Sequence, residues 1–412
     1  MSSSTAAGKV GTGTRWAVAR PPAEAYHSAM KTKETVDRSW QFDELHTILM
    51  EQLLGEVEAG RRSEADFAAA MKAAVEEAVP EAARLWLDEL RRTTPRMLRG
   101  HRAIARGFVR RNLRRWKPGF DALEVLLVVA GEAGEAVNAT QRSAAAAAED
   151  CKFEALVGLH GRAILVAREI LWLMQGGFAD GALGRWRTLH EVAVVATFLG
   201  QHDARISERY LLHRTVRSAK AAEQYKEYEQ AAGLVPFDAT DLANLVASRE
   251  AICQKHGAEM REDWGWAATA LGKAKRITFF DIEKSVGLDH WRPSYRWASQ
   301  DTHGNFRPSV TSLGMCEAHE EMILIGPSNS GMVDPGQMMA HAVVIATLPL
   351  LMLEPNVDRL ATMKMLGALR AEVGAALVAA ERESLETDGR AWMALRELPG
   401  KVTAKLRAVT GW

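Results

Sequence analysis

GFADGALGRWRTLHEVAVVATFL, residues 177–199, holds the clearest structural pattern in this 412-residue chain. The preceding residues 153–177 form a long segment whose Leu and Ile residues recur at helical spacing, and the pair Gly176-Gly177 ends it. After a short turn at Phe178–Asp180 the apolar pattern resumes and continues to the end of the stretch. Two apolar helices joined by so short a turn predict a tightly packed helical hairpin.

Two charged residues, Arg187 and Glu191, lie four positions apart within the second of these helices, with apolar residues on both sides. Because a lone buried charge is costly, such residues are expected to be paired. One interpretation is an internal ion pair that holds two helices in register. The other places both residues in a functional cleft, where Arg187 adds charge for a phosphate and Glu191 orients an arginine or a histidine.

WRPSYRWASQDTHGN, residues 291–305, is the candidate catalytic stretch. Its residues Tyr295, Ser299 and His303 recur every four positions, so they share one face in a helix, and the Gly-Asn pair after the histidine predicts the helix end. A histidine exchanges protons near neutral pH, and the nearby Arg296 can hold a phosphate through a planar pair of donors. An Arg and a His on one helix suit RNA cleavage without a metal.

A structural interpretation of the same residues stays open. An Arg followed by a His at similar spacing also occurs at Arg20–His27, Arg96–His101, Arg185–His190 and Arg249–His256. The spacing is therefore weak by itself, and a hydrogen-bonded polar helix end accounts for it equally well. The 296–303 segment differs by a serine one turn before the histidine, a polar Gln-Asp-Thr run and the Gly-Asn stop.

A second unusual segment is the basic run from Arg91 to Lys117, which contains no acidic residue and has interleaved aromatic residues. The prolines predict helix starts at Pro80 and at Thr93-Thr94-Pro95. Arginines mixed with aromatic residues suit a phosphate backbone and stacked bases. RNA binding is therefore predicted for Arg99, Arg106, Arg110 and Arg114. Alternatively, the Glu-rich helices that precede the run dock against it and neutralise it.

The composition limits the class of protein. Lys+Arg and Asp+Glu number 52 each, so a polyanion site must come from local clustering and not from overall charge. The three cysteines are far apart and form no CxxC pair, and residues 1–20 lack the apolar core of a signal peptide. No apolar run reaches the roughly 18 residues of a membrane helix. We therefore expect a cytoplasmic protein without a membrane segment.

No motif for a metal or a cofactor is evident. Cys316, His319, Glu320 and Glu321 are close in sequence, but their spacing matches no zinc-binding signature. The chain also has no Gly-rich phosphate loop, no Gly-x-Ser-x-Gly elbow and no HExxH motif. We expect neither a metal nor a cofactor.

The patterns together predict an all-α protein in three parts. Residues 1–34 are expected to form a flexible tail, and residues 35–118 an N-terminal helical lobe that includes the Arg-rich helix. Residues 119–412 are expected to form a helical bundle with additional C-terminal helices. Within it, Thr278 is expected to cap a short helix that ends near Gly287.

The two quoted stretches resemble a bacterial helical family, domain of unknown function 5677. Members carry Arg-x-x-x-Glu on one helix and Tyr-x-x-x-Ser-x-x-x-His on a later one. Both patterns are present here, at Arg187–Glu191 and at Tyr295–Ser299–His303. The resemblance covers roughly residues 150–350 and leaves the N-terminal lobe unexplained.

The arrangement is also similar to the HEPN superfamily of helical-bundle proteins, many of which are RNases in toxin–antitoxin, abortive-infection and other phage-defence systems. These enzymes use an Arg followed after four to six residues by a His, usually with two copies meeting across a dimer, and Arg296 and His303 fit that spacing. The chain departs from the pattern at Trp297, where those RNases commonly have a polar residue. This departure leaves open a non-cleaving relative.

The resemblance implies a HEPN-like helical bundle that acts as a metal-independent endoribonuclease. His303 would act as general base or acid on the ribose 2′-hydroxyl or the leaving oxygen, and Arg296 with Arg187 would stabilise charge on the phosphate. Glu191 and Ser299 would set the geometry. Tyr295 and the Arg-rich helix would bind the RNA.

The resemblance further implies a homodimer and an antitoxin or another defence-system protein as partner. The alternative function is a non-catalytic sensor or scaffold of a phage-defence system, which binds a partner protein, a nucleotide or a nucleic acid. In that case the Arg, Glu and His residues form a buried polar network instead of an open catalytic site.

Overall fold

The computed structural model describes residues 16–17, 44–273, 275–300, 311–318 and 323–396. Helices make up most of this part of the chain, which confirms the predicted all-α class. The described residues also contain a parallel pair of two-residue strands, β1 (Trp16–Ala17) and β2 (Ile323–Leu324), in which Trp16 lies opposite Ile323. No helix within the described ranges combines the length and the apolar character needed to cross a membrane.

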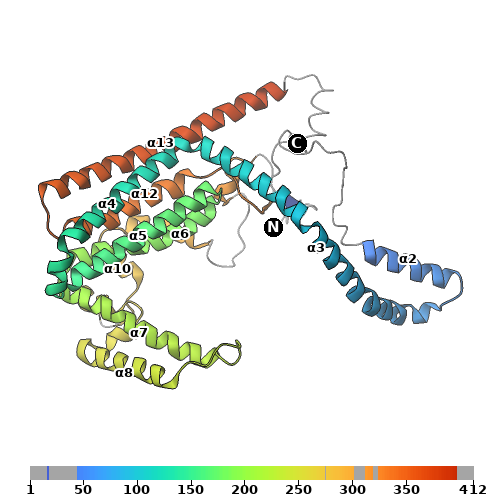
Figure 1. Ribbon diagram of the computed structural model, residues 1–412, viewed down its shortest axis with the longest axis horizontal. Helices are drawn as coiled ribbons and strands as arrows, with labels where there is room; N and C mark the ends of the chain where they lie inside the picture. The colour runs from blue at the N-terminus through green and yellow to red at the C-terminus, as the bar shows by residue number, and fades with distance from the viewer. Residues whose placement is uncertain (1–15, 18–43, 274, 301–310, 319–322, 397–412) are drawn as a thin grey trace, which may run out of the picture. The chain divides into compact units, whose positions relative to one another are not determined.

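Five long helices lie side by side and carry the core (Figure 1). They are α4 (Lys117–Ala147), α5 (Cys151–Gln175), α6 (Ala179–Gln201), α12 (Val333–Leu351) and α13 (Val357–Arg396). α5 packs against α4, α6 and α12, while α13 packs against α4 and α12. Their apolar faces bury the large side chains of Phe153, Trp186 and Phe198 almost completely, and burial of such large apolar surfaces stabilises the bundle.

α5 and α6 form the predicted hairpin. Asp150 caps α5, because its carboxylate accepts hydrogen bonds of 2.9 and 3.0 Å from two backbone N–H groups in the first turn. Gly177 makes the turn between the helices with a φ of 87°, a conformation that favours glycine. Asp180 then accepts backbone hydrogen bonds of 2.8 and 3.0 Å from η6 (Leu313–Met315), which fixes that short helix to the hairpin.

A second pair of helices, α7 (Ala204–Tyr228) and α8 (Ala239–His256), packs on the bundle through the contact between α7 and α5 (Figure 1). Thr278 caps α10 (Phe279–Ser285) through reciprocal hydrogen bonds with Asp281, which confirms the predicted cap. The short elements between α8 and α12 are η2 (Ala258–Arg261), η3 (Gly265–Ala267), α9 (Ala268–Leu271), α10 (Phe279–Ser285), η4 (Asp289–Trp291) and α11 (Arg292–Gln300), followed by η6 and β2.

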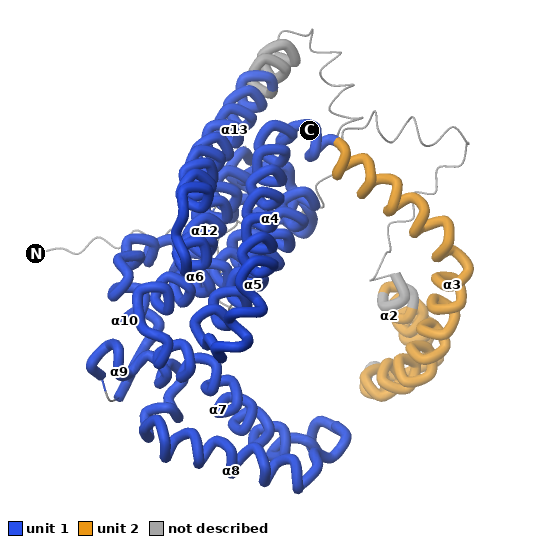
Figure 2. The backbone as a smooth tube through the Cα atoms, turned by 60° about the vertical axis from the view of Figure 1, so that its left-hand side comes forward, with its two compact units in different colours: residues 1–19, 111–403 blue, residues 20–110, 404–412 orange. Residues whose placement is uncertain are grey.

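The chain divides into two compact units (Figure 2). Of the described residues, the first unit contains 16–17 and 111–396, and the second contains 44–110. The second unit consists of α2 (Glu44–Glu58), η1 (Glu64–Asp66) and the part of α3 (Phe67–Arg115) that precedes residue 111. The predicted division after residues 34 and 118 stays a prediction, and most of the predicted tail lies outside the described residues.

α3 is one continuous helix of 49 residues, so the predicted helix starts at Pro80 and at Thr93-Thr94-Pro95 are wrong. The hydroxyls of Thr93 and Thr94 donate to backbone carbonyl oxygens of the preceding turn at 2.9 and 2.7 Å. They therefore bond back along the same helix and do not cap a new one. A proline inside a helix removes one backbone hydrogen bond, a loss that the long helix-forming sequence around it tolerates here.

Candidate functional site

α6 and α11 bring together three residues of the two motif stretches. The Tyr295 hydroxyl on α11 donates a hydrogen bond of 2.5 Å to Oε1 of Glu191 on α6. Nε of Arg187 lies 3.4 Å from the same carboxylate oxygen, and its guanidinium carbon lies 4.8 Å from the centroid of the Tyr295 ring. Tyr295 is buried, whereas the side chains of Arg187 and Glu191 are 30% and 32% exposed. The three residues form a partly buried polar cluster that links the helices.

The electrostatics of this cluster keep Tyr295 protonated. Burial, together with the hydrogen bond to Glu191, raises the pKa of Tyr295 to about 12, and the nearby Arg187 opposes that rise. At neutral pH the phenol is therefore a hydrogen-bond donor to Glu191 and not a base. Tyr295 positions α11 against α6.

A second polar cluster lies in the interior beside the first. Nε2 of His190 lies 2.8 Å from Oε1 of Glu283, and Nη1 of Arg292 lies 3.1 Å from Oε2 of the same residue. Glu283 is fully buried, and the guanidinium of Arg292 covers the Phe280 ring at 4.8 Å. Because a buried carboxylate needs compensating partners, this cluster fixes α6, α10 and the start of α11 to one another.

The remaining residues of the predicted catalytic stretch differ in exposure and in bonding. Arg296 is exposed and forms no hydrogen bond or ion pair within the described ranges. The Ser299 hydroxyl donates to the backbone carbonyl of Tyr295 at 2.7 Å, so both lie on one face of α11, as their spacing predicts. His303 lies outside the described residues, as does the Gly-Asn pair after it. The catalytic roles of these residues stay predictions.

A cleft of about 900 Å³ opens between α5, α6, α7 and the loop that carries Trp264 and Trp266. Glu191 lines it, so the cluster between α6 and α11 reaches its wall. The wall also includes Arg162 of α5 and, from α7, Tyr210, Arg214 and Arg217. The sequence-predicted Arg187 and Tyr295 contact Glu191 but do not line this cleft themselves.

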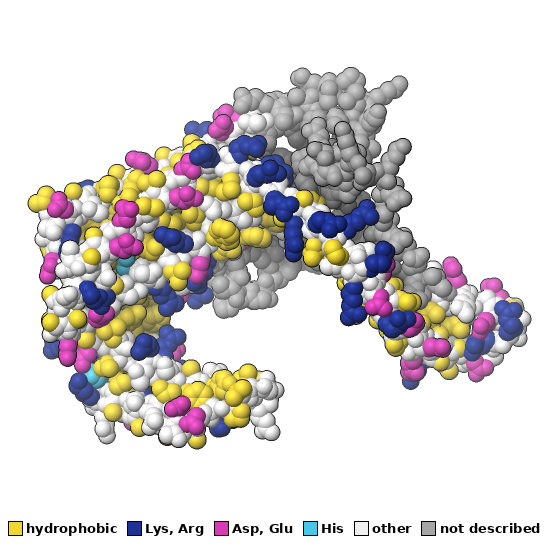
Figure 3. Space-filling model, in the orientation of Figure 1, with side chains coloured by type: hydrophobic (Ala, Val, Ile, Leu, Met, Phe, Trp, Pro, Cys, Tyr) yellow, Lys and Arg dark blue, Asp and Glu magenta, His cyan; other side chains and the backbone are white. Residues whose placement is uncertain are grey.

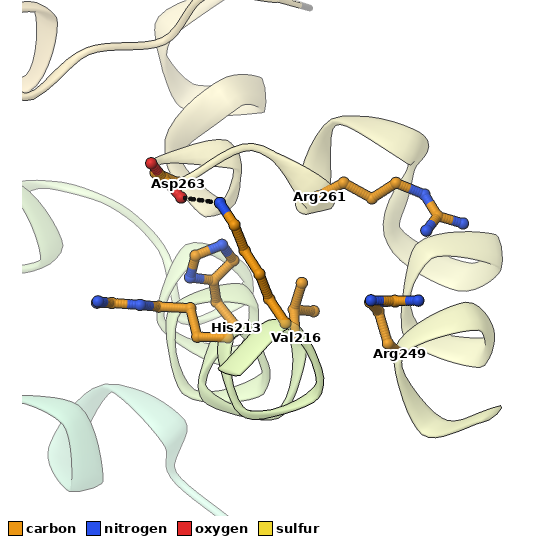
Figure 4. Close-up of a pocket in the computed structure, with 7 residues that line it drawn as sticks. His213, Val216, Arg249, Arg261 and Asp263 are labelled. Carbon is orange, nitrogen blue, oxygen red and sulfur yellow. Dashed lines mark hydrogen bonds and ion pairs between the residues drawn. The ribbon is translucent and has the colours of Figure 1, made fainter. Parts of the chain in front are cut away.

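A smaller pocket of about 170 Å³ adjoins the cleft, with which it shares His213, Arg217 and Asp263. Figure 4 shows Arg249 and Arg261 together on one side of it, and both pair with the carboxylate of Glu250. Nε2 of His213 lies 2.9 Å from the backbone oxygen of Glu262. Burial lowers the pKa of His213 below its ordinary value of 6.5, so the imidazole is mostly neutral at pH 7. The pocket is thus lined by charges that other residues already satisfy, apart from Arg217.

The basic half of α3 presents its predicted RNA-binding residues to solvent, and Figure 3 shows Lys and Arg side chains gathered along this helix. Arg91 and Arg92 pair with Asp88 and Glu89 of the preceding turn. Arg99, Arg106, Arg110 and Arg114 are exposed and form no ion pair with any described residue. Within the second unit, no described glutamate of the preceding helices pairs with Arg99, Arg106 or Arg110.

Among the described residues, no group of three or more His, Cys, Asp or Glu side chains is arranged to hold a metal ion. Cys316 is described, whereas His319, Glu320 and Glu321 lie outside the described residues.

Sequence reasoning missed two groups of residues. The buried Glu283 had no distinctive signal, because its short helix also carries Asp281 and Lys284, and the sequence does not show which of these charges is buried. The cleft arginines Arg162, Arg214 and Arg217 had none either. α7 carries many charges, and only its packing against α5 determines which of them face the cleft.

Comparison with known proteins gives one match. Residues 153–320 match the model of a family described as a family of unknown function, DUF5677. No curated protein and no solved structure matches the chain. The matched segment runs from Phe153 in α5 through α11 and hence contains both stretches of the motif. The resemblance to family 5677 that the sequence predicted is therefore confirmed over residues 153–320.

Proposed function

We propose that this protein is a metal-independent endoribonuclease of the HEPN type, acting in a bacterial defence or toxin–antitoxin system. The observation that carries the proposal is the contact between Tyr295 of α11 and Glu191 of α6, which joins the two stretches of the motif. Arg296, the next residue along α11, is exposed. An arginine in that position is accessible to a phosphate, as cleavage requires.

The proposed reaction needs a proton acceptor and a proton donor. His303 takes the proton of a ribose 2′-hydroxyl, whose oxygen attacks the adjacent phosphorus. The bond from phosphorus to the 5′-oxygen then breaks, and that oxygen receives a proton from the imidazolium. The products are a 2′,3′-cyclic phosphate and a 5′-hydroxyl end, and no metal takes part.

The other motif residues support this chemistry. Arg296, helped by Arg187, stabilises the negative charge on the phosphate oxygens in the transition state. Glu191 holds Arg187 in place at 3.4 Å, and Ser299 sets the geometry of α11 through its bond to the Tyr295 carbonyl. Glu191 and Ser299 are therefore positioning residues.

RNA binding is assigned to the exposed arginines of α3, whereas Tyr295, which is buried and bonded to Glu191, holds α11 in place beside the site. A row of unpaired guanidinium groups binds a phosphate backbone without regard to sequence. By resemblance, the bundle is HEPN-like and two copies of the motif meet in a homodimer. An antitoxin or another defence-system protein is then the partner that controls activity.

The test uses purified wild type, Arg296→Ala, His303→Ala and the control Arg168→Ala, incubated with end-labelled RNA in EDTA. Arg168 is an exposed arginine of α5. We expect wild type and control to cleave and leave cyclic phosphate ends, and the other two variants to lose activity by about a hundredfold or more. Equal cleavage by His303→Ala, or cleavage that needs added Mg²⁺, would contradict the proposal.

The second candidate is a non-catalytic sensor or scaffold in phage defence, which binds a partner protein, a nucleotide or a nucleic acid. It is favoured by the mutual bonding of Arg187, Glu191 and Tyr295, since groups that satisfy one another can serve packing alone. Phage challenge separates the two functions. Protection that survives His303→Ala supports the scaffold, whereas protection lost together with RNA cleavage supports the RNase.

A further inference from the structure

A group of three arginines, separate from the motif, lines the cleft between α5, α6 and α7. Arg162 belongs to α5, and Arg214 and Arg217 belong to α7. All three are exposed, and none forms a hydrogen bond or an ion pair within the part of the chain that the structure describes. Like charges around one cleft repel one another, so an anion bound among them would relieve an electrostatic cost.

The carboxylates that line the same cleft do not neutralise these arginines. Each is paired with a cation that does not line the cleft: Glu154 with Arg142, Asp263 with Lys220, and Glu191 with Arg187. The acidic charges of the wall are therefore already compensated from outside. The three arginines leave the cleft with a positive balance.

Aromatic side chains lie beside this charge. Tyr210 and Trp264 line the cleft and are half-buried, and the buried Trp266 packs edge-on against Tyr210, with 5.1 Å between the ring centroids. Burial raises the pKa of Tyr210, and the charges of Arg162 and Arg217 oppose that rise. Both guanidinium groups thus act on one phenol from two different helices. The cleft combines positive charge with aromatic surface.

We propose that this cleft binds a nucleotide, free or within an RNA strand, with its phosphate on Arg162, Arg214 and Arg217. The base packs against Tyr210 or Trp264. Guanidinium groups bind phosphate oxygens through paired donors, and aromatic rings stack on any base. A volume of about 900 Å³ is that of a small-molecule site.

The inference goes beyond the proposed cleavage reaction. It uses neither Arg296 nor His303 and predicts binding whether or not the protein cuts RNA. Arg249 and Arg261 of the adjoining small pocket differ from the arginines of the cleft because they are already paired with carboxylates. Both share Glu250, so they offer less attraction to an anion than the three arginines of the cleft do.

Two probes measure binding without cleavage: ATP, and a fluorescent oligoribonucleotide methylated at every 2′-oxygen, which blocks attack by that oxygen. They are titrated against wild type, the double variant Arg162→Gln/Arg217→Gln and the control Arg168→Gln, whose arginine lies on α5 outside the cleft. We expect the double variant to weaken binding of at least one probe by about tenfold or more, since a charge-assisted hydrogen bond is worth roughly tenfold. The control should change binding by less than about twofold.

If the double variant weakens binding of ATP alone, the ligand of the cleft is a free nucleotide, and if it weakens binding of the oligonucleotide alone, the ligand is a strand. The proposal is overturned if wild type binds neither probe, or if the double variant binds both as tightly as the control. Thermal unfolding of each variant checks that the fold is kept. We expect it to be kept because the substituted arginines are exposed. His303→Ala should keep full binding, which separates a failure of the cleft from a failure of the proposed cleavage site.

Discussion

α7 carries arginines in two opposite situations, and the contrast separates structural charge from charge that is free to bind a ligand. Arg209 is buried, and its guanidinium donates to the backbone oxygens of Trp266 and Gly265 at 3.1 and 3.0 Å and to the Glu259 carboxylate at 3.0 Å. Arg214 and Arg217, farther along the same helix, are exposed at the cleft and form no hydrogen bond or ion pair with the described residues. A buried charge must be satisfied inside the protein, whereas an exposed one stays solvated until a ligand replaces the water.

The largest expected effect comes from removing the satisfied arginine. Arg209→Met leaves a mostly buried carboxylate and three backbone carbonyl oxygens without their donor, so the free energy of unfolding should fall by about 3–5 kcal/mol. Urea unfolding at neutral pH measures it. Arg214→Met is the matched control on the same helix and should change stability by less than about 0.5 kcal/mol. Similar losses of stability in both variants would show that the buried, paired arginine stabilises the fold no more than the exposed one does.

A buried histidine, His160, makes the stability of the protein depend on pH. Burial lowers the pKa of His160 from 6.5 to about 4, with a backbone carbonyl opposing the shift. The unfolded chain therefore takes up a proton below pH 6.5 while the folded one does not, so stability present above 6.5 is lost as the pH falls toward 4.

We expect protonation linked to His160 to lower the free energy of unfolding of wild type by about 2 kcal/mol between pH 7 and pH 5. His160→Gln should lose less stability over the same pH range, because it lacks this contribution. Urea unfolding at the two pH values checks it, with the exposed His101→Gln as control. If His160→Gln declines as steeply as wild type, burial does not control this proton.

Tyr295 lies between the two situations, because it is buried but bonds to a carboxylate that is a third exposed. Tyr295→Phe removes the donor to Glu191, which water can partly replace, so stability should fall by about 1–2 kcal/mol. The exposed Tyr228→Phe should leave stability unchanged. Urea unfolding compares the two, and an unchanged stability of Tyr295→Phe would show that the contact between α6 and α11 does not hold the helices together.

The smallest effect on stability is expected at Lys220, whose pair with Asp263 is 65% and 73% exposed. Lys220→Gln should cost at most about 1 kcal/mol, as exposed ion pairs do. It leaves the Asp263 charge uncompensated at the cleft, however, and should weaken nucleotide binding severalfold. Lys226→Gln, whose lysine pairs with Glu229 away from the cleft, is the control. Calorimetric titration with ATP would show whether the two lysines differ.

The sequence by itself determined most of the helices. The apolar periodicity and the glycine pair specified the α5–α6 hairpin, and Thr278 specified the start of α10. These signals are local, because a periodic face and a cap depend on residues within a few positions of one another. Where a local signal was overridden, as at Pro80 and Pro95, the surrounding helical sequence continued through it.

Only the tertiary structure decided what each charged residue does. The bond from Tyr295 to Glu191 joins residues 104 positions apart, and no local pattern distinguishes Arg209 from Arg214 on α7. Their different roles follow from how α7 packs against α5 and the loop at 257–266. The sequence placed the charges along the helices, and the fold selected which were satisfied inside and which faced the cleft, because burial and pairing depend on residues from distant parts of the chain.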